Sequence, residues 1–238
     1  MTVSAERELE LRSLSTRLAL DLDNIELLDR ALTHASIQSE QNGPAYDYES
    51  LEFLGDAALS LAVAHYLFAH APDRSPGEYS RMRASLVNQA CLAQVAERLQ
   101  IAPVIRLGKG EEMSGGRGRA ALLADCLEAM IGTVYLEKGW EDAHRLVVRF
   151  FRNELEHAAR TDAGWDHKSR LQHYCQAEKI PLPRFELVRS EGPDHQKFFE
   201  VEVFVRGTAA GRGSGSSKKE AEQNAARAAL MREGLTGT

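Results

Sequence analysis

Hydrophobic and polar positions follow a helical period over the first two thirds of the chain. Apolar residues recur there at spacings of three and four, which is typical of helices packed on a core, and strand-like alternation is absent. The pattern predicts helices over residues 9–20, 25–35, 48–68, 78–88, 89–100, 120–138 and 140–157. We therefore expect an all-α domain over residues 9–157.

The period changes after residues 158–164, which are mostly small or polar and are predicted to form a linker. Phenylalanine or valine occupies every second position from 199 to 205, as expected for a strand with one buried face. The pattern predicts a helix, three strands and a second helix over residues 168–178, 185–190, 198–206, 208–214 and 217–231. The order αβββα predicts a small α+β domain over residues 165–235.

Acidic residues interrupt two of the most apolar predicted helices. Glu49, Glu52 and Asp56 are spaced i, i+3 and i+7, so they share one face of the first helix. Asp125 and Glu128 are spaced i and i+3 on the second helix. A helix that is apolar all round is a buried helix, and buried carboxylates are costly unless a cation meets them. A solvated face or an ion pair explains one acid pair, but two such clusters favour a shared divalent metal site.

The formal net charge of −6 hides a difference between the two predicted domains. Residues 1–165 hold 17 Lys and Arg against 25 Asp and Glu, whereas residues 166–238 hold 12 against 10. An acidic chain argues weakly against a nucleic-acid partner, but local charge decides that question. The mildly basic C-terminal part therefore leaves such a partner open.

Cysteine use and hydropathy predict an intracellular protein without a membrane partner. Cys91, Cys126 and Cys175 form no CxxC pair and no zinc pattern, which is typical of reduced thiols in a cytosol. No apolar run is expected to be long enough to span a membrane. The charged first twenty residues argue against a signal peptide, so we expect a cytoplasmic location.

The acid-bearing segment at residues 48–56, Tyr-Glu-Ser-Leu-Glu-Phe-Leu-Gly-Asp, resembles the signature of ribonuclease III, a family of double-stranded-RNA endonucleases. That signature reads roughly Asn-Glu-Arg-Leu-Glu-Phe-Leu-Gly-Asp, so Tyr48 and Ser50 depart from it. Residues 77–88 and 125–132 resemble the next two family blocks and follow in the same order. The resemblance implies the ribonuclease III endonuclease fold for the all-α domain.

The C-terminal αβββα unit resembles a double-stranded-RNA-binding domain. Its marks are Gly-Pro-Asp-His at residues 192–195 and Ser-Lys-Lys-Glu-Ala at residues 217–221. His173 stands where a Glu often follows the Gln of the first helix, which leaves details of RNA pairing open. Such a domain reads the shape of A-form RNA through phosphates and 2′-hydroxyls rather than through bases.

The same resemblance implies which residues contact RNA. Lys218 and Lys219 lie at a predicted helix start, where backbone N–H groups already favour phosphate. Ser169 and Gln172 share a face of the first helix and are expected to reach 2′-hydroxyls, and His195 is expected to reach a second minor groove. Simple solvation is the alternative for the lysine pair taken alone.

The resemblance also implies a site for phosphodiester hydrolysis. Divalent ions can activate water and stabilise charge on the phosphate, and Mg²⁺ prefers carboxylate oxygen; Mn²⁺ is an expected substitute, and no organic cofactor is expected. The predicted metal ligands are Glu52, Asp56, Asp125 and Glu128. Among them, Glu128 is predicted to bridge two ions and Asp56 to orient the attacking water. Glu49 and Glu78 are predicted to act as outer-shell or RNA-positioning groups.

The resemblance further implies a homodimer in which each subunit cuts one strand, giving 5′-phosphate and 3′-hydroxyl ends and a short 3′ overhang. Phe53, beside the acids, is consistent with such a dimer, although an ordinary core aromatic is the alternative reading. Ribosomal RNA precursors and other structured transcripts are the expected substrates.

Two other functions compete with this interpretation. One is a catalytically inert, dimeric double-stranded-RNA-binding protein, which has no need to keep repulsive acids. The other is a helical metal-carboxylate oxidase, but the Glu-x-x-His pairs of such sites are missing. His34 is predicted to be a hydrogen-bonded or second-shell residue, and the glycine-rich loop over residues 108–119 either contacts RNA or forms a plain surface turn.

Overall fold

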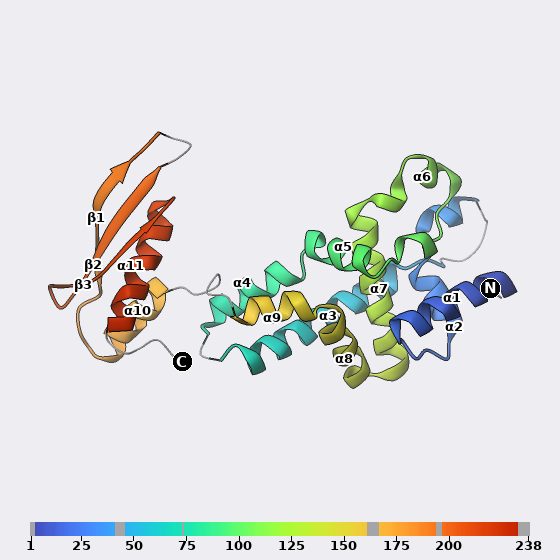
Figure 1. Ribbon diagram of the computed structural model, residues 1–238. Helices are drawn as coiled ribbons and strands as arrows, with labels where there is room; N and C mark the ends of the chain where they lie inside the picture. The colour runs from blue at the N-terminus through green and yellow to red at the C-terminus, as the bar shows by residue number, and fades with distance from the viewer. Residues whose placement is uncertain (1–2, 41–45, 73, 161–166, 194–196, 233–238) are drawn as a thin grey trace. The chain divides into compact units, whose positions relative to one another are not determined.

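The computed structural model describes residues 3–40, 46–72, 74–160, 167–193 and 197–232 (Figure 1). Contacts divide the chain into two units, Met1–Gly164 and Trp165–Thr238. The described part of the first unit is helical, and that of the second holds a three-stranded sheet and two helices. Both predicted fold classes are therefore confirmed.

Twelve helical elements are described in the first unit, three of which are 3₁₀ turns labelled η. They are α1 (Ala5–Leu18), α2 (Ile25–Ala31), η1 (Ala35–Glu40), α3 (Glu49–His70), α4 (Pro76–Leu86), α5 (Gln89–Arg98), η2 (Ala102–Val104), α6 (Lys109–Met113), η3 (Gly116–Gly118), α7 (Ala120–Lys138), α8 (Trp140–Phe150) and α9 (Arg152–Arg160). Side-chain caps help to fix where four of them begin, because each cap accepts a hydrogen bond from the backbone N–H three residues later. The capping residues are Ser4, Asn24, Ser75 and Asn88.

Several predicted boundaries differ from the observed ones, and three of the differences change the description of the fold. α2 ends at Ala31, not at residue 35, and the chain then runs beside Arg106 through an isolated bridge with Thr33. The single helix predicted over residues 140–157 is divided into α8 and α9 at Phe151, whose side chain is fully buried. α9 continues to Arg160, so the first three residues of the predicted linker are helical.

The two acid-bearing helices, α3 and α7, cross at a pair of glycines. A Cβ atom added to Gly55 would lie well under 3.0 Å from the main-chain oxygen of Glu128, and one added to Gly132 would clash in the same way with the main-chain oxygen of Leu51. Only glycine therefore permits this close approach. The crossing brings the acidic segments of the two helices together in the core of the unit.

The prediction that α3 is buried on all sides is wrong for one face. Phe53, Ala57, Leu61 and Phe68 lie on this face at helical spacing and are exposed, Phe53 to 81%. Helices of the same chain cover the other sides of α3, chiefly α7, α8 and α4. By contrast, α7 is buried over most of its length.

α3 also contradicts the prediction that no apolar run could span a membrane. Among the described residues it is the one helix that is long and apolar enough to do so, with a mean hydropathy of 1.3. Length and composition are weak evidence, because a core helix of a soluble protein passes the same test. The glycine crossing with α7 favours a core helix with one uncovered face.

The second unit comprises α10 (His167–Ala177), β1 (Arg184–Glu191), β2 (Phe198–Val205), β3 (Thr208–Gly215) and α11 (Lys218–Arg232). The strands are antiparallel in the order β1-β2-β3. α11 lies against β2 and β3 and beside α10 (Figure 1). Alanines of α11 pack against Gly211 and Gly213 of β3, where any Cβ would meet the helix backbone. These small residues hold α11 close to the sheet.

Candidate active site

Three of the predicted metal ligands converge where α3 crosses α7. Glu52 comes from α3, and Asp125 and Glu128 come one turn apart on α7. Each offers a carboxylate oxygen, and these three atoms all lie within 4.8 Å of one another. Glu128 is buried, whereas Glu52 and Asp125 are half-buried. The arrangement provides hard oxygen donors for a divalent ion, as Mg²⁺ or Mn²⁺ requires.

The electrostatics of the cluster also fit a cation. Burial, with the charges of Asp56, Glu52 and Asp125 adding to its effect, raises the pKa of Glu128 to about 8. Burial likewise raises the pKa of Glu52, with Asp125, Glu49 and Asp56 adding to the effect. Like charges that lie close together in a partly desolvated site disfavour the ionised form of each carboxyl group. A bound cation would relieve this cost, so the cluster is consistent with a metal site.

Asp56, the fourth predicted ligand, lies at the edge of the cluster. It is exposed, so the expectation that all these acids are buried is wrong for this residue. Its carboxylate does not belong to the group within 4.8 Å, although its charge raises the pKa of both Glu128 and Glu52. Glu49 is also exposed and raises the pKa of Glu52 from the first turn of α3. Both therefore face the cluster without joining it.

Glu78 lies in a different environment from the other predicted site residues. Its carboxylate accepts a hydrogen bond from the Ser75 N–H at 2.7 Å, and its own N–H donates to Ser75 Oγ at 3.3 Å. This is a capping box at the start of α4. The residue is fully buried. Its position favours a role in holding α4 over direct contact with RNA.

Two residues outside the predicted ligand set, Tyr48 and His34, act on Asp125. The Tyr48 hydroxyl donates to Asp125 Oδ2 at 3.3 Å. Burial raises the pKa of Asp125, whereas the Tyr48 hydrogen bond and the charge of nearby His34 act in the opposite direction. His34 Nδ1 accepts a hydrogen bond from the Ser36 N–H at 3.1 Å, which agrees with the hydrogen-bonded position predicted for it. The signal for Tyr48 in the sequence was its departure from the usual Asn.

The predicted RNA-contacting residues lie on the two helices of the second unit, except for His195, which lies outside the described residues. Lys218 and Lys219 occupy the first two positions of α11 and are exposed. Ser169 and Gln172 are half-buried on α10. Lys168 Nζ bonds to a carboxylate oxygen of Glu222 at 2.7 Å. This ion pair links α10 to α11, the two helices that carry the described predicted contacts.

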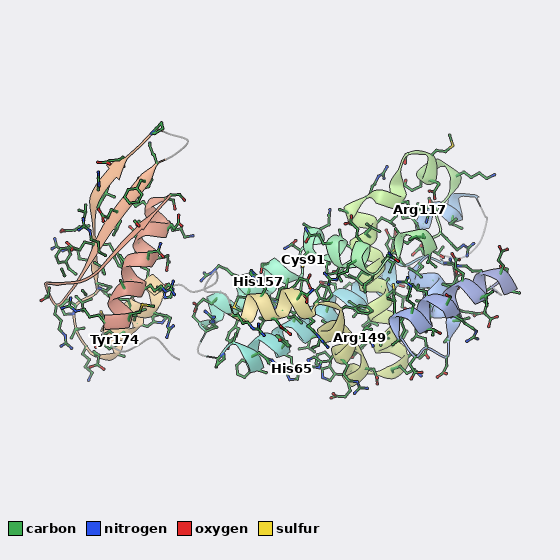
Figure 2. The ribbon with its side chains drawn as sticks, viewed as in Figure 1. His65, Cys91, Arg117, Arg149, His157 and Tyr174 are labelled. Carbon is green, nitrogen blue, oxygen red and sulfur yellow. The ribbon has the colours of Figure 1, made fainter. Side chains whose placement is uncertain are left out.

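The glycine-rich loop over residues 108–119 is structured by its own arginines. Arg117 (Figure 2) donates to the main-chain oxygens of Ala102 at 2.6 Å and Ile105 at 2.8 Å, and it pairs with Glu112. Arg119 pairs with Glu111 at 2.7 Å. Because these cations already have local partners, the structure favours a surface turn over an RNA contact.

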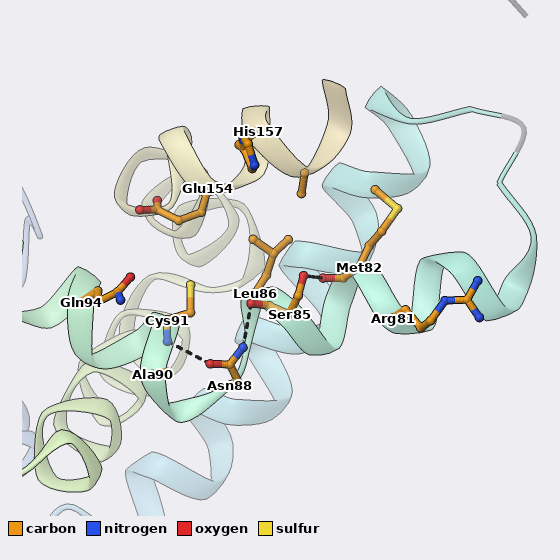
Figure 3. A pocket seen from close by; sticks show the side chains of 11 residues that line it. Arg81, Met82, Ser85, Leu86, Asn88, Ala90, Cys91, Gln94, Glu154 and His157 are labelled. Carbon is orange, nitrogen blue, oxygen red and sulfur yellow. Dashed lines mark hydrogen bonds between the residues drawn. The ribbon is translucent and has the colours of Figure 1, made fainter. Parts of the chain in front are cut away.

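A separate cavity of about 530 Å³ lies among α4, α5 and α9 (Figure 3). Its lining includes Met82, Cys91, Glu154 and His157. None of the predicted site residues lines it. The cavity therefore does not take part in the carboxylate site.

Comparisons with known proteins agree with this arrangement. A family model described as "Ribonuclease-III-like" matches residues 24–155, and one described as "Double-stranded RNA binding motif" matches residues 167–232. The chain is 42% identical over 209 residues to "Ribonuclease 3" of Syntrophotalea carbinolica, which covers 87% of this chain and 90% of that protein. It is 47% identical over 204 residues to "Ribonuclease 3" of Thermobifida fusca, covering 86% and 84%.

A solved structure gives the same result for the helical unit. It is the nuclease domain of ribonuclease III from Campylobacter jejuni, in a study of flexibility in the region involved in dimer formation. The match has a TM-score of 0.57 and 36% identity, and it covers 60% of this chain and 97% of that one. The chain therefore belongs to the ribonuclease III family and is a double-stranded-RNA-specific endoribonuclease of the bacterial type.

Proposed function

We propose that Glu52, Asp125 and Glu128 hold Mg²⁺, with Asp56 beside them, and that this is where the enzyme hydrolyses the RNA backbone. The observation that carries the proposal is the convergence of three carboxylates from two helices within 4.8 Å. A structural cluster of this kind would normally contain a cationic side chain, because repulsion is otherwise uncompensated. Within the part of the chain that the structure describes, no Lys or Arg contributes to the pKa of Glu52, Asp125 or Glu128.

The residues of the site have distinct tasks. When bound, Mg²⁺ supplies an activated water and neutralises charge on the phosphate and the leaving oxygen. Glu128 is the most buried of the three carboxylates, and we propose that it would be the ligand shared by two divalent ions. Asp56 is exposed at the rim, where it can reach a water near the RNA and accept its proton. Hydrolysis of the bond between phosphorus and the 3′ oxygen leaves a 5′-phosphate on one fragment and a 3′-hydroxyl on the other.

The second unit supplies affinity for the duplex. Lys218 and Lys219 place two cations at the start of α11, where the helix N-terminus also favours phosphate. Ser169 and Gln172 on α10 are proposed to contact 2′-hydroxyls, and His195 to contact a second minor groove. Glu49 lies near Glu52 and is proposed to act as an outer-shell group.

The uncovered face of α3 is the proposed surface for a second copy of the chain. Phe53, Ala57, Leu61 and Phe68 form an exposed apolar stripe, which is unusual for a lone helix face. Two copies paired along it would place two carboxylate sites on one duplex, so that each subunit cuts one strand. The Campylobacter jejuni nuclease domain has a region involved in dimer formation, which gives pairing of two copies a precedent in the family.

Precursors of ribosomal RNA and other structured transcripts are the proposed substrates, in the cytoplasm. The competing function is an inert, dimeric double-stranded-RNA-binding protein, and one experiment separates the two. The full chain is incubated with a perfect RNA duplex with Mg²⁺, with Mn²⁺ and with EDTA, and the product ends are determined. Cleavage that needs the metal and leaves 5′-phosphates supports the proposal. Binding without cleavage in every metal would overturn it.

A further inference from the structure

Tyr48 connects the two helices that carry the carboxylates. Its backbone begins α3, because its carbonyl oxygen accepts hydrogen bonds from the N–H groups of Leu51 and Glu52, each at 2.9 Å. Its own N–H donates to the Thr33 oxygen at 3.1 Å. Its side chain makes no capping bond to α3. Instead, the hydroxyl reaches across to Asp125 on α7.

The hydroxyl of Tyr48 is held as a donor. The side chain is only 6% exposed, and burial, followed by the charge of Asp125, raises its pKa. A carboxylate can only accept, so the proton of the Tyr48–Asp125 bond belongs to the phenol. The O···O distance of 3.3 Å is long for such a bond. The contact is therefore a weak one, and its role rests on the direction that it gives the Asp125 carboxylate.

Because Tyr48 is the donor in this bond, the Asp125 carboxylate can still bind a cation at the cluster. One oxygen of Asp125 accepts from Tyr48, which restricts rotation of the carboxylate and leaves its remaining lone pairs for a cation. Groups that hold a metal ligand by a hydrogen bond commonly control affinity for the metal. The ring of His34 lies 5.8 Å from that of Tyr48 in a tilted arrangement, so the tyrosine ring also has an aromatic neighbour.

We propose that Tyr48 is a positioning residue, which orients Asp125 toward the divalent ion and ties the start of α3 to α7. This inference rests on the proposed metal site. It assigns a task to a residue that stands where the family signature usually has Asn. Tyr48 touches neither the RNA backbone nor the reacting water in this role, because it acts through Asp125.

The test compares Tyr48→Phe with wild type and with Tyr46→Phe. Tyr46 is a matched control, because its hydroxyl donates to the Glu26 main-chain oxygen at 2.9 Å, away from the carboxylates. Binding of Mn²⁺ to the RNA-free protein is measured by calorimetry, and cleavage is measured against Mg²⁺ concentration. We expect Tyr48→Phe to raise the Kd for Mn²⁺ and the half-saturating Mg²⁺ concentration about tenfold, with duplex affinity unchanged. Tyr46→Phe should change neither.

A double-mutant cycle distinguishes an effect of Tyr48 through Asp125 from a general effect on the fold. In an Asp125→Asn background, Tyr48→Phe should have no further effect on Mn²⁺ affinity, because the group that it orients has been changed. Equal Mn²⁺ affinity of wild type and Tyr48→Phe would overturn the role of Tyr48 while leaving the metal site in place. A lower melting temperature of the metal-free Tyr48→Phe protein with unchanged affinity would do the same. Absence of Mn²⁺ binding by wild type would instead remove the proposed metal site itself.

Discussion

Gly55 of α3 lies directly against the main chain of Glu128 on α7, with no room for a Cβ atom between them. Glu52 is one turn before Gly55, so this contact sets the separation of two of the three converging carboxylates. The site is therefore built on a helix crossing rather than on a loop. Its geometry depends on the absence of one methyl group.

Gly55→Ala should separate α3 from α7 and damage both stability and metal binding. Inserting a methyl group into a packed core lowers the free energy of unfolding by about 1–3 kcal/mol, and occasionally by more. Urea unfolding and Mn²⁺ calorimetry measure the two effects. Gly110→Ala is the control, because nothing lies within 4 Å of a Cβ at that position. A Gly55→Ala protein as stable as Gly110→Ala would show that the crossing is not as tight as described.

Glu128→Gln should abolish cleavage and leave duplex binding nearly intact. The amide keeps the size of the side chain but loses the charge that holds the cation, so we expect a fall in kcat on the order of 10³-fold or more. Glu141→Gln on α8 is the control, because Glu141 is exposed and outside the cluster. Cleavage is followed on a labelled duplex, and binding is followed in Ca²⁺ or EDTA. Normal cleavage by Glu128→Gln would remove the site assignment.

The raised pKa of Glu128 predicts an unusual pH dependence for the metal-free protein. In the unfolded chain a glutamate ionises near pH 4.3, whereas burial raises the pKa of Glu128 to about 8 in the folded state. Between these values the folded state binds more protons, so the free energy of unfolding falls as pH rises. We expect a loss of a few kcal/mol from pH 5 to 8 in EDTA.

Two comparisons isolate this effect from other titrating groups. Glu128→Gln should show a flatter decline over the same pH window, since it lacks the titrating group. Mg²⁺ should stabilise wild type more at pH 8 than at pH 6, because the ion competes with protons for the carboxylates. Parallel urea-unfolding profiles for wild type and Glu128→Gln would contradict the assignment of the decline to Glu128.

Replacing Lys218 and Lys219 by Ala should weaken duplex binding and flatten its dependence on salt. Each lost phosphate contact lowers the slope of log K against log salt by about 1. The control is Arg184→Ala with Arg212→Ala, which removes two charges that are paired with Glu186 and Glu200 on the sheet. Binding is measured over a range of KCl concentrations. An unchanged slope in the lysine variant would argue against phosphate contacts at α11.

The sequence predicted two acid-bearing helices because helical spacing and an apolar background are local properties. Their convergence was inferred from chemistry, since one shared cation would relieve the repulsion on both helices. The sequence did not predict that Asp56 and Phe53 are exposed. The spacing of apolar residues does not distinguish a helix face that is buried within the chain from one that stays exposed. Glu78, predicted to be an outer-shell or RNA-positioning group, is placed by a local backbone contact. Ser75 and Glu78 have the spacing of a capping box, and that local signal explains the carboxylate without any RNA. The Tyr48–Asp125 contact joins residues far apart in the chain, which no local pattern reveals.

The exposed stripe on α3 predicts that one charge can prevent self-association. Leu61 is 57% exposed in the middle of the stripe and away from the carboxylates. Burying a Glu against a second copy is costly, so Leu61→Glu should give monomers in sedimentation at concentrations where wild type is dimeric. Met113→Glu is the control, because Met113 is 88% exposed on α6, outside the stripe. Each subunit carries its own carboxylates, so monomers should keep Mn²⁺ binding yet lose paired cuts on a duplex. Dimers of unchanged strength in Leu61→Glu would place the interface elsewhere.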